Sequence, residues 1–457
     1  MSAQGKSIWP WLRSSNSQNS LQQAAEAEAR QRSDMIDMEL AAERARLQQE
    51  SKTKILLLGP SEAGKTTVVK NFQLAFTPKS FLAQAAAWLP VIQLNLVHSV
   101  NTILDALDLV RSDSAEPEDS EYQSSHTIPE DLRQLGGRIA EKLAELESEL
   151  SGELYSSAPP PSSRPPSRSD HERPRLQHRL SMVSVRGVTL RHKPTEFQSA
   201  FPSWKIVVDR ARAILAECAP DIASLWAHPW VRSGLKAQGI HPEHQPGYFL
   251  PDAARIASPH YLPTPEDILR ARLTTASAEE HSLMLDVGMA RKEWLLCDVG
   301  GSRSQRGAWA QYFDDAKLVI FVASLTAFDE TLAEDSAVNR LTDTLLLWRN
   351  ICANKLLASV ELVLFLNKLD ILKAKLENAG VAFVHHVNSF KSRPNDVPTV
   401  SKYIKEMFLA QYRQYSSSER KVFAHITCAV DPTAMYPVMG AVRDVILHSY
   451  MSQSTPV

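Results

Sequence analysis

Residues 54–67 read KILLLGPSEAGKTT, an apolar run that leads into Gly59, Gly64, Lys65 and Thr66. The apolar run predicts a buried parallel strand, and the glycines predict a loop that turns its backbone N–H groups toward an anion at a helix N-terminus. In such a loop Lys65 reaches the β and γ phosphates of a nucleotide, while the Thr66 hydroxyl binds Mg²⁺. The alternative is a surface turn that happens to contain glycine. The strand before the loop favours the phosphate-binding interpretation.

A second motif, NKLD at residues 367–370, follows another apolar run at residues 360–366. An aspartate at a strand end accepts two hydrogen bonds from guanine N1 and N2, and adenine lacks these donors. Because unpaired buried polar groups are costly, a site built for one base rejects the other. Asparagine and aspartate after a strand usually form only a turn. The later segment TCA at residues 427–429 supports base binding, because we expect the Ala429 N–H to reach the guanine oxygen.

Residues 295–301, LLCDVGG, lie between these motifs and predict a strand that ends in DxxG. A chain of this length contains about one or two DxxG patterns by chance, so the order of the motifs carries the information. We expect Asp298 to hold Mg²⁺ through water and the Gly301 N–H to contact a γ-phosphate. The segment would then become ordered only in the triphosphate state.

Together these motifs resemble those of heterotrimeric G-protein alpha subunits. The matching segments are GPSEAGKTT (59–67), YLPTPEDILRARLTT (261–275), DVGGSRSQRGAW (298–309), FLNKLD (365–370), TCAV (427–430), SDMIDMEL (33–40) and AVRDVIL (441–447). The first three resemble the family's P-loop, first switch and second switch. The likeness runs from about residue 33 to the end of the sequence, except for a poorly matched stretch between about 113 and 202.

The resemblance implies a role for each residue that matches a family motif. Arg272 would act as a built-in arginine finger, which neutralises charge on the transferring phosphoryl group, and Glu62 would pair with it across the cleft. The implied catalytic positions are Arg272, Lys65 and Ser302, and the implied Mg²⁺ ligands are Thr66 and Thr275. The implied GTP/GDP-binding residues are Glu62, Ala63, Gly64, Lys65, Thr66, Thr67, Leu269, Arg270, Arg272, Thr275, Asp298, Gly301, Asn367, Lys368, Asp370 and Ala429.

Two positions depart from the family pattern and bear on hydrolysis. Ser302 stands where the family has a glutamine that orients the attacking water, and a serine hydroxyl is too short to reach that water. Ser61 stands where the family has a glycine, and its side chain would crowd the arginine and the water. We therefore expect slow intrinsic hydrolysis of GTP unless a partner supplies the missing group. Alternatively, the neighbouring Gln305 or Ser304 takes over this role.

The expected fold is α/β: a P-loop GTPase domain with a doubly wound, mostly parallel sheet, interrupted by an inserted all-helical domain. An N-terminal tail and exposed helix would occupy residues 1–51, and the GTPase domain would occupy residues 52–72 and 259–457. The helical domain would occupy residues 73–258. It would contain a disordered insert at about 113–200, because proline, serine and charged residues there cannot bury enough surface to fold.

Three further patterns predict helices. Apolar residues at three- and four-residue steps in 91–109 and 204–225 predict helices of the inserted domain. Residues 21–51 contain no proline or glycine and predict one long exposed helix. A terminal helix is expected at 442–450.

Composition limits the cellular setting. The 457 residues carry a formal net charge of −2, so the sequence implies no general field for nucleic acid or membrane. The 4 cysteines lack pair spacing and are expected to be reduced in the cytosol. No apolar stretch approaches the roughly 20 residues of a membrane span, no signal peptide is visible, and Met1–Ala3 lack the glycine needed for myristoylation. We expect a cytoplasmic protein, held peripherally at the inner face of the plasma membrane through its partners.

The resemblance implies as partners a G-protein beta-gamma dimer, a seven-helix receptor, a downstream effector and a GTPase-accelerating protein, and no nucleic acid. Met35, Ile36 and Leu40 lie at helical spacing and would contact the beta-gamma dimer. The chain would then be a signalling switch, off with GDP and on with GTP and Mg²⁺. A second hypothesis is a GTP-bound scaffold with negligible turnover. A third, an ATP-using P-loop enzyme, is disfavoured by NKLD.

Overall fold

The computed structural model describes residues 32–33, 35–36, 38, 52–113, 128–155, 204–238, 240–245, 247–272, 278–287, 290–332, 334–416 and 420–453. The chain divides into two compact units, one of Met1–Thr53 with Asp286–Glu293 and one of Lys54–Leu285 with Trp294–Val457. None of the helices in the described ranges combines the length and the apolar character that a bilayer span requires.

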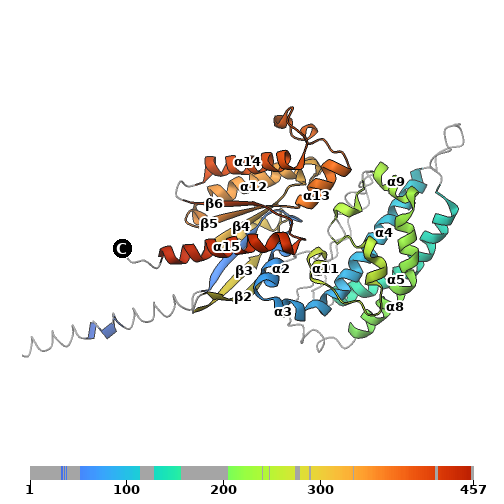
Figure 1. The fold of residues 1–457 in the computed structure, drawn as a ribbon, viewed down its shortest axis with the longest axis horizontal. Coiled ribbons are helices and arrows are strands. Elements are labelled where there is room, and N and C mark those ends of the chain that lie inside the picture. Colours follow the sequence, from blue (N-terminus) through green and yellow to red (C-terminus); the bar gives the residue numbers. More distant parts are fainter. Residues whose placement is uncertain are drawn as a thin grey trace, which may run out of the picture. The chain divides into compact units, whose positions relative to one another are not determined.

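Within the described residues, six strands form one sheet in the order β2-β3-β1-β4-β5-β6 (Figure 1). The strands are β1 (Thr53–Leu58), β2 (Glu279–Val287), β3 (Ala290–Asp298), β4 (Ala316–Ser324), β5 (Glu361–Asn367) and β6 (Val422–Ile426). The pairs β1 with β4, β4 with β5, and β5 with β6 are all parallel. Because parallel strands end at the same edge of a sheet, the loops after these strands gather there. The prediction of an α/β fold with a mostly parallel sheet is confirmed.

Helices cover both faces of this sheet. One pair is α12 (Arg340–Ala353) with α14 (Val397–Tyr415), and the other is α2 (Lys65–Phe76) with α15 (Pro432–Gln453). Figure 1 shows the two pairs on opposite sides of the strands. Consecutive residues of β1, Leu56 and Leu57, are both fully buried. A strand covered on both faces carries a continuous apolar run, which is why residues 55–58 read as Ile-Leu-Leu-Leu.

Aromatic packing joins α12 and α14 to the sheet. The Trp348 ring of α12 lies 5.0 Å from the Phe321 ring of β4 and 6.4 Å from the Phe408 ring of α14. The indole Nε1–H of Trp348 donates to the Phe408 carbonyl oxygen at 2.9 Å, so its polar atom is satisfied inside the core. Asn339 caps α12 by accepting from the Leu341 N–H at 3.0 Å, which fixes where that helix begins.

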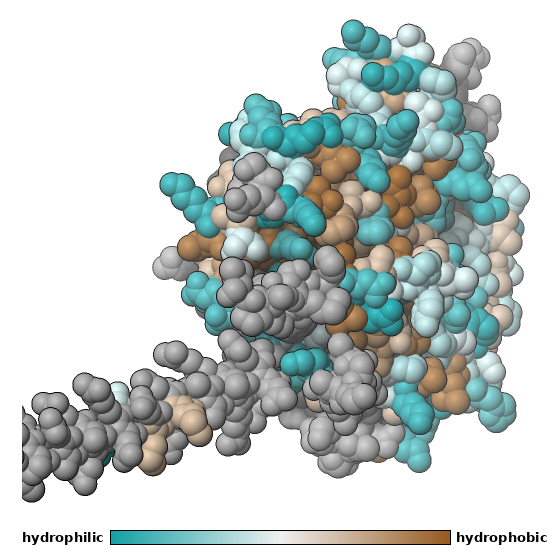
Figure 2. Space-filling view, turned by 60° about the vertical axis from the view of Figure 1, so that its left-hand side comes forward, coloured by the Kyte–Doolittle hydropathy of each residue, from teal (hydrophilic) through white to brown (hydrophobic). Residues whose placement is uncertain are grey.

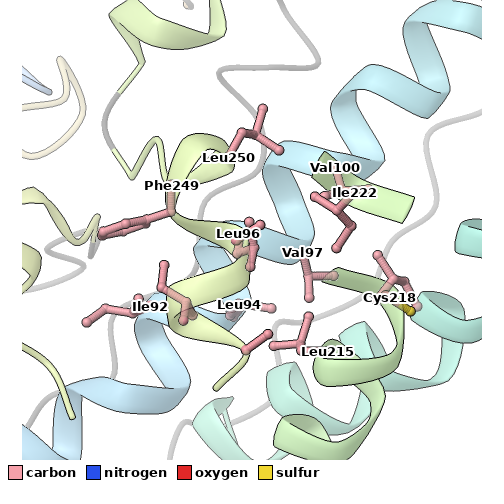
Figure 3. Packing of buried hydrophobic residues seen from close by; sticks show 14 of the residues in the cluster. Ile92, Leu94, Leu96, Val97, Val100, Leu215, Cys218, Ile222, Phe249 and Leu250 are labelled. Atoms are coloured by element: carbon pink, nitrogen blue, oxygen red, sulfur yellow. The ribbon is translucent and has the colours of Figure 1, made fainter. Parts of the chain in front are cut away.

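A second set of helices lies between α2 and β2 in the sequence. These are α3 (Pro78–Ala83), α4 (Leu89–Asp113), α5 (Glu130–Tyr155), α8 (Trp204–Ala227), α9 (Pro229–Ala237), α10 (Ala253–Ile256) and α11 (Pro265–Arg270). They bury a separate apolar cluster. Figure 3 shows Val97 and Val100 of α4 near Leu215 and Ile222 of α8. The helices expected at 91–109 and 204–225 are confirmed as α4 and α8.

Part of the stretch expected to be disordered is helical. Residues 130–155 form α5, and its apolar side chains at helical spacing are buried: Leu132, Ile139, Leu143, Leu146 and Leu150. The prediction was wrong here because it rested on the polar and proline-rich composition of the whole stretch. Residues 130–155 carry a narrow apolar stripe at helical spacing, which an average over the whole stretch does not reveal. Residues 114–127 and 156–203 lie outside the described residues.

Helices were expected near both ends of the chain. In the first unit, Met35 and Ile36 are helical and exposed by 71% and 50%, whereas Leu40 and most of residues 21–51 lie outside the described residues. The terminal helix expected at 442–450 is present but longer, because α15 begins at Pro432.

Polar and apolar side chains alternate over the surface, as Figure 2 shows for one face. Exposed large apolar residues occur on several elements, including Leu346 of α12 and Tyr436 of α15. Scattered apolar side chains are ordinary on protein surfaces.

Candidate nucleotide-binding site

The loop between β1 and α2 folds over its own lysine. The Lys65 ammonium donates to the carbonyl oxygens of Gly59 at 3.0 Å and Pro60 at 2.9 Å. Gly64 caps α2 in the left-handed region, with φ at 101°, and Glu62 also has a positive φ of 59°. The loop therefore places a cation at the N-terminus of a twelve-residue helix, where the helix dipole also favours an anion.

Lys65 lies in surroundings that suit an anionic ligand. It is only 6% exposed, and burial lowers the pKa of its amine to about 8, although the Asp298 carboxylate opposes this shift. A phosphate beside the amine would stabilise its charged form. The DxxG segment approaches the same amine, because a Cβ added to Gly301 would lie 2.5 Å from Lys65 Nζ. The loop between β1 and α2 and the DxxG segment therefore meet at Lys65.

Two oxygen-bearing side chains suited to Mg²⁺ meet between α2 and β3. The Thr66 hydroxyl donates to Asp298 Oδ2 at 2.6 Å, and Asp298 is fully buried. Mg²⁺ prefers oxygen ligands and usually keeps waters and substrate phosphates around one or two protein groups. In the described part of the chain, no group of three or more His, Cys, Asp or Glu side chains is placed to hold a metal. This pair therefore fits a shared Mg²⁺–phosphate site, and the other expected ligand, Thr275, lies outside the described residues.

Asn367 of the NKLD motif ties two loops together. Its Nδ2 donates to the Ala63 carbonyl at 2.9 Å, and its Oδ1 accepts from the Ala429 N–H at 2.9 Å and from the Thr427 hydroxyl at 3.3 Å. The Ala429 N–H, which we expected to reach the guanine oxygen, donates to this asparagine in the structure. The phosphate-binding loop and the expected base-binding loops are therefore held next to each other.

Of the other three NKLD residues, Leu369 and Asp370 lie beside the 427–429 loop. Asp370 is exposed in the first turn of α13 (Leu369–Lys373), and the Leu369 N–H donates to the Thr427 carbonyl at 3.2 Å. Burial raises the pKa of the Cys428 thiol to about 12, and the neighbouring Asp370 carboxylate raises it further. Lys368 has a left-handed backbone with φ at 69°, and burial lowers the pKa of its amine. Asp370, the residue expected to recognise guanine, is thus an exposed carboxylate beside the 427–429 loop.

Arg272 reaches the phosphate-binding loop. Its Nη2 lies 2.6 Å from Glu62 Oε1, so the expected pair is present. Arg340 of α12 lies 3.2 Å from Glu62 Oε2 and 3.0 Å from Glu330 Oε2. Burial would raise the pKa of Glu62, but Arg272 and Arg340 outweigh it and lower the pKa. Glu62 is therefore an ionised bridge between the two arginines.

Ser302 is engaged with its neighbours in the second switch. Its hydroxyl donates to Gln305 Oε1 at 2.7 Å and lies 3.1 Å from the Ser304 hydroxyl. The Gln305 amide group lies directly against Gly300. The backbone carbonyl of Ser61 accepts from Arg340. A glutamine amide therefore lies near the paired glycines, three residues later than the family pattern places it.

Three of the residues expected to bind the nucleotide have surroundings of another kind. Leu269 is buried, Thr67 is half-buried on α2, and the Arg270 side chain pairs with Asp252 at 3.6 Å rather than with the phosphate-binding loop. The sequence reasoning also missed Arg340. The sequence offers only a weak indication of its place, because Arg340 directly follows Asn339, a residue type that often begins helices.

Comparisons with known proteins point to the family that the motifs predict. A sequence profile described as "G-protein alpha subunit" matches residues 30–446. The guanine nucleotide-binding protein alpha-4 subunit of Mycosarcoma maydis is 27% identical, over 86% of this chain and 82% of that protein. The alpha-2 subunit of Neurospora crassa is 26% identical, over 94% and 96% of the two chains. The G(o) subunit alpha of Geodia cydonium is 27% identical, over 92% and 94%.

The profile covers most of the 457 residues and includes every loop described above. The family expected from the motifs is thereby confirmed, and the chain belongs to the G-protein alpha subunit family.

Proposed function

We propose that this chain is a guanine-nucleotide switch, the alpha subunit of a heterotrimeric G protein that relays receptor signals. One observation carries the proposal: the phosphate-binding loop, the DxxG loop and the NKLD loop meet through side-chain contacts. Lys65 lies against Gly301, Thr66 donates to Asp298, and Asn367 donates to Ala63. These contacts bring together the loops that are expected to bind the phosphates, the metal and the base.

Each residue then has a defined task. Lys65 and the loop amides would hold the β and γ phosphates, Thr66 and Asp298 would hold Mg²⁺, and Asp370 would recognise guanine. Bound Mg²⁺ neutralises charge on the phosphates. Arg272 contributes a second positive charge once its guanidinium leaves Glu62. Thr275, which lies outside the described residues, would be a further Mg²⁺ ligand in the triphosphate state.

Hydrolysis is proposed to be slow. A glutamine after the paired glycines would reach far enough to accept from a water and donate to a phosphate, whereas a serine hydroxyl is shorter and has a single proton to donate. The single Ser302 hydroxyl proton already points to Gln305 at 2.7 Å. Ser302 is therefore poorly suited to orient the attacking water, and a GTPase-accelerating partner would have to supply the missing group.

The helices between α2 and β2 are proposed to form an inserted domain that covers the nucleotide. Their separate apolar core, built largely from α4, α5 and α8, supports an independent folding unit. A lid of this kind slows nucleotide escape. The boundaries at about 73 and 258 remain those expected from the sequence, and α2 extends past the first of them to Phe76.

Partners and location follow from the family. We propose a beta-gamma dimer bound to the N-terminal helix, a seven-helix receptor and an effector, with the protein peripheral at the inner face of the plasma membrane. The exposed Met35 and Ile36 support the beta-gamma contact, because apolar side chains on a polar helix gain from a partner.

The direct test is single-turnover hydrolysis of labelled GTP, combined with identification of the nucleotide that co-purifies. Wild type should hydrolyse GTP slowly, Ser302→Gln should accelerate it, and Ser302→Ala should change it little. Arg272→Ala should slow it by a factor of roughly 10³ or more. A rate that is fast in wild type and unchanged in Ser302→Ala would contradict slow hydrolysis through Ser302.

The same experiment tests two alternative functions, each of which is favoured by particular residues. Ser61 and Ser302 favour a GTP-bound scaffold, which would co-purify with GTP and show no turnover in Arg272 variants or wild type. The Gln305 amide beside Gly300 favours substitution of the missing glutamine by Gln305. In that case Gln305→Ala would slow hydrolysis as strongly as Arg272→Ala.

A further inference from the structure

A buried asparagine from the helical region holds the backbone of Arg272. Asn95 of α4 is 4% exposed. Its Oδ1 accepts from the Arg272 N–H at 2.7 Å, and its Nδ2 donates to the Arg272 carbonyl oxygen at 3.3 Å. One side chain therefore satisfies both backbone groups of one residue. That residue lies directly before the segment 273–277, which is outside the described residues.

A buried lysine holds the residues just before Arg272. The Lys70 amine of α2 donates to the Ile268 carbonyl at 2.8 Å and to the Ala271 carbonyl at 2.9 Å, and it lies 4.0 Å from the centroid of the Trp88 ring. The last carbonyls of a helix lack partners within the helix, and a cation suits this end. Lys70 thereby closes the C-terminal end of α11 and fixes where the chain leaves it.

The contact between Asn95 and Arg272 also depends on a glycine. Gly247 has φ at +80°, and its N–H donates to the Arg270 carbonyl at 3.2 Å. A Cβ at Gly247 would lie 2.9 Å from Asn95 Oδ1 and 3.1 Å from Arg272 Cβ. Both the positive φ and the lack of space require glycine here. Three separate segments thus converge on the backbone of residues 268–272.

We propose that Asn95 is a positioning residue for hydrolysis, which acts by fixing the backbone from which the Arg272 guanidinium extends. The inference rests on the proposed role of Arg272 as the arginine finger. In this structure the guanidinium is bound to Glu62 at 2.6 Å, so it must swing to reach a phosphoryl group while its backbone stays in place. A misplacement of about 1 Å in a catalytic group lowers a rate by roughly 100-fold. Asn95 would thereby contribute to the reaction without touching the nucleotide.

A double-mutant cycle tests this mechanism, because a residue that acts only through Arg272 has no effect once that side chain is removed. The variants are Asn95→Leu, Arg272→Ala and their combination. We expect Asn95→Leu to slow single-turnover GTP hydrolysis by at least about tenfold and to add nothing in the Arg272→Ala background. The affinity for a non-hydrolysable GTP analogue should change by less than about threefold. Asn101→Leu, at a half-buried asparagine on the same helix, is the matched control and should hydrolyse GTP as wild type does.

The outcomes distinguish the proposed function of Arg272 from the positioning role of Asn95. If Arg272→Ala does not slow hydrolysis, the proposed function of Arg272 is wrong. If Arg272→Ala slows it but Asn95→Leu does not, or if the two effects multiply, the positioning role of Asn95 is wrong.

A measurement that needs no turnover completes the test. Hydrogen exchange of the GDP-bound protein should become at least about tenfold faster at the Arg272 amide in Asn95→Leu, since that N–H loses its acceptor. Asn95→Asp keeps the acceptor and loses the donor, so it should leave this amide protected. If Asn95→Leu does not fold, Asn95→Asp decides the kinetic question, with a smaller rate loss that again disappears in Arg272→Ala. Unchanged exchange in Asn95→Leu overturns the inference.

Discussion

At the scale of single residues, Asp370 carries the expected preference for guanine. It is exposed at the start of α13, and its carboxylate lies beside Cys428. Asp370→Asn replaces a charged acceptor with an amide that accepts and donates less suitably. Hydrogen bonds to a charged group contribute about 1.5–3 kcal/mol, so GTP affinity should fall roughly 10- to 100-fold. Calorimetry with GTP, GDP and ATP measures this change.

The control for this substitution is Asp444→Asn, at an exposed carboxylate of α15 that pairs with the adjacent Arg443. It should bind GTP as wild type does. An equal preference for GTP and ATP in wild type, or selectivity that survives in Asp370→Asn, would remove the basis for a guanine site.

At the scale of elements, the second switch is docked onto α12 through an ionic contact. Arg306 begins the short helix η4 (Arg306–Tyr312), and its Nη2 lies 2.7 Å from Asp343 Oδ2. Asp343 is 8% exposed and also contacts Arg303 at 3.4 Å. Asp343→Ala would leave both cations without this acceptor, at a cost of about 1–3 kcal/mol. We expect faster hydrogen exchange across residues 300–312 and a lower melting temperature.

Asp335→Ala is the matched control for this contact. It removes a carboxylate that also contacts Arg303 at 3.4 Å, but both side chains of that pair are 41% exposed. Exposed ion pairs contribute at most about 1 kcal/mol, so residues 300–312 should exchange as in wild type. If both variants loosen the segment equally, the ionic contact with α12 does not hold it.

Prediction from sequence succeeded where a short segment determines its own structure. The phosphate-binding loop was visible because its glycines and Lys65 lie within a few residues, and β1 was visible because a strand buried on both faces is continuously apolar. Asn95 and Arg340 could not be found in this way. Their partners are 177 and 278 residues away in the sequence, and only the fold brings them together. Helix α5 was missed because its stripe is narrow and its flanks are polar.

At the scale of the whole molecule, buried lysines link stability to pH. Burial lowers the pKa of the Lys70 amine to about 7 and that of Lys65 to about 8, from an ordinary value of 10.5. Below pH 7 both amines are charged in the folded and unfolded states, and the folded protein bears the full cost of burying them. Between pH 7 and 10.5 these two lysines bind fewer protons in the folded state than in the unfolded state, so their contribution to stability rises with pH. Acidic groups with lowered pKa values, such as Glu330 at about 2, stay ionised throughout this range and add no slope.

The Lys70→Met variant isolates one of these contributions. Neutral Lys70 keeps N–H donors for the Ile268 and Ala271 carbonyls, so wild type retains both contacts as the amine loses its proton. Urea unfolding of the GDP-bound protein at pH 6.5, 7.5 and 8.5, at fixed excess GDP, should show wild type gaining on Lys70→Met by up to about 1.4 kcal/mol per pH unit. The pH dependence of GDP binding cancels in this difference. A difference between the two proteins that stays constant from pH 6.5 to 8.5 would mean that Lys70 does not lose its proton in the folded state near neutral pH.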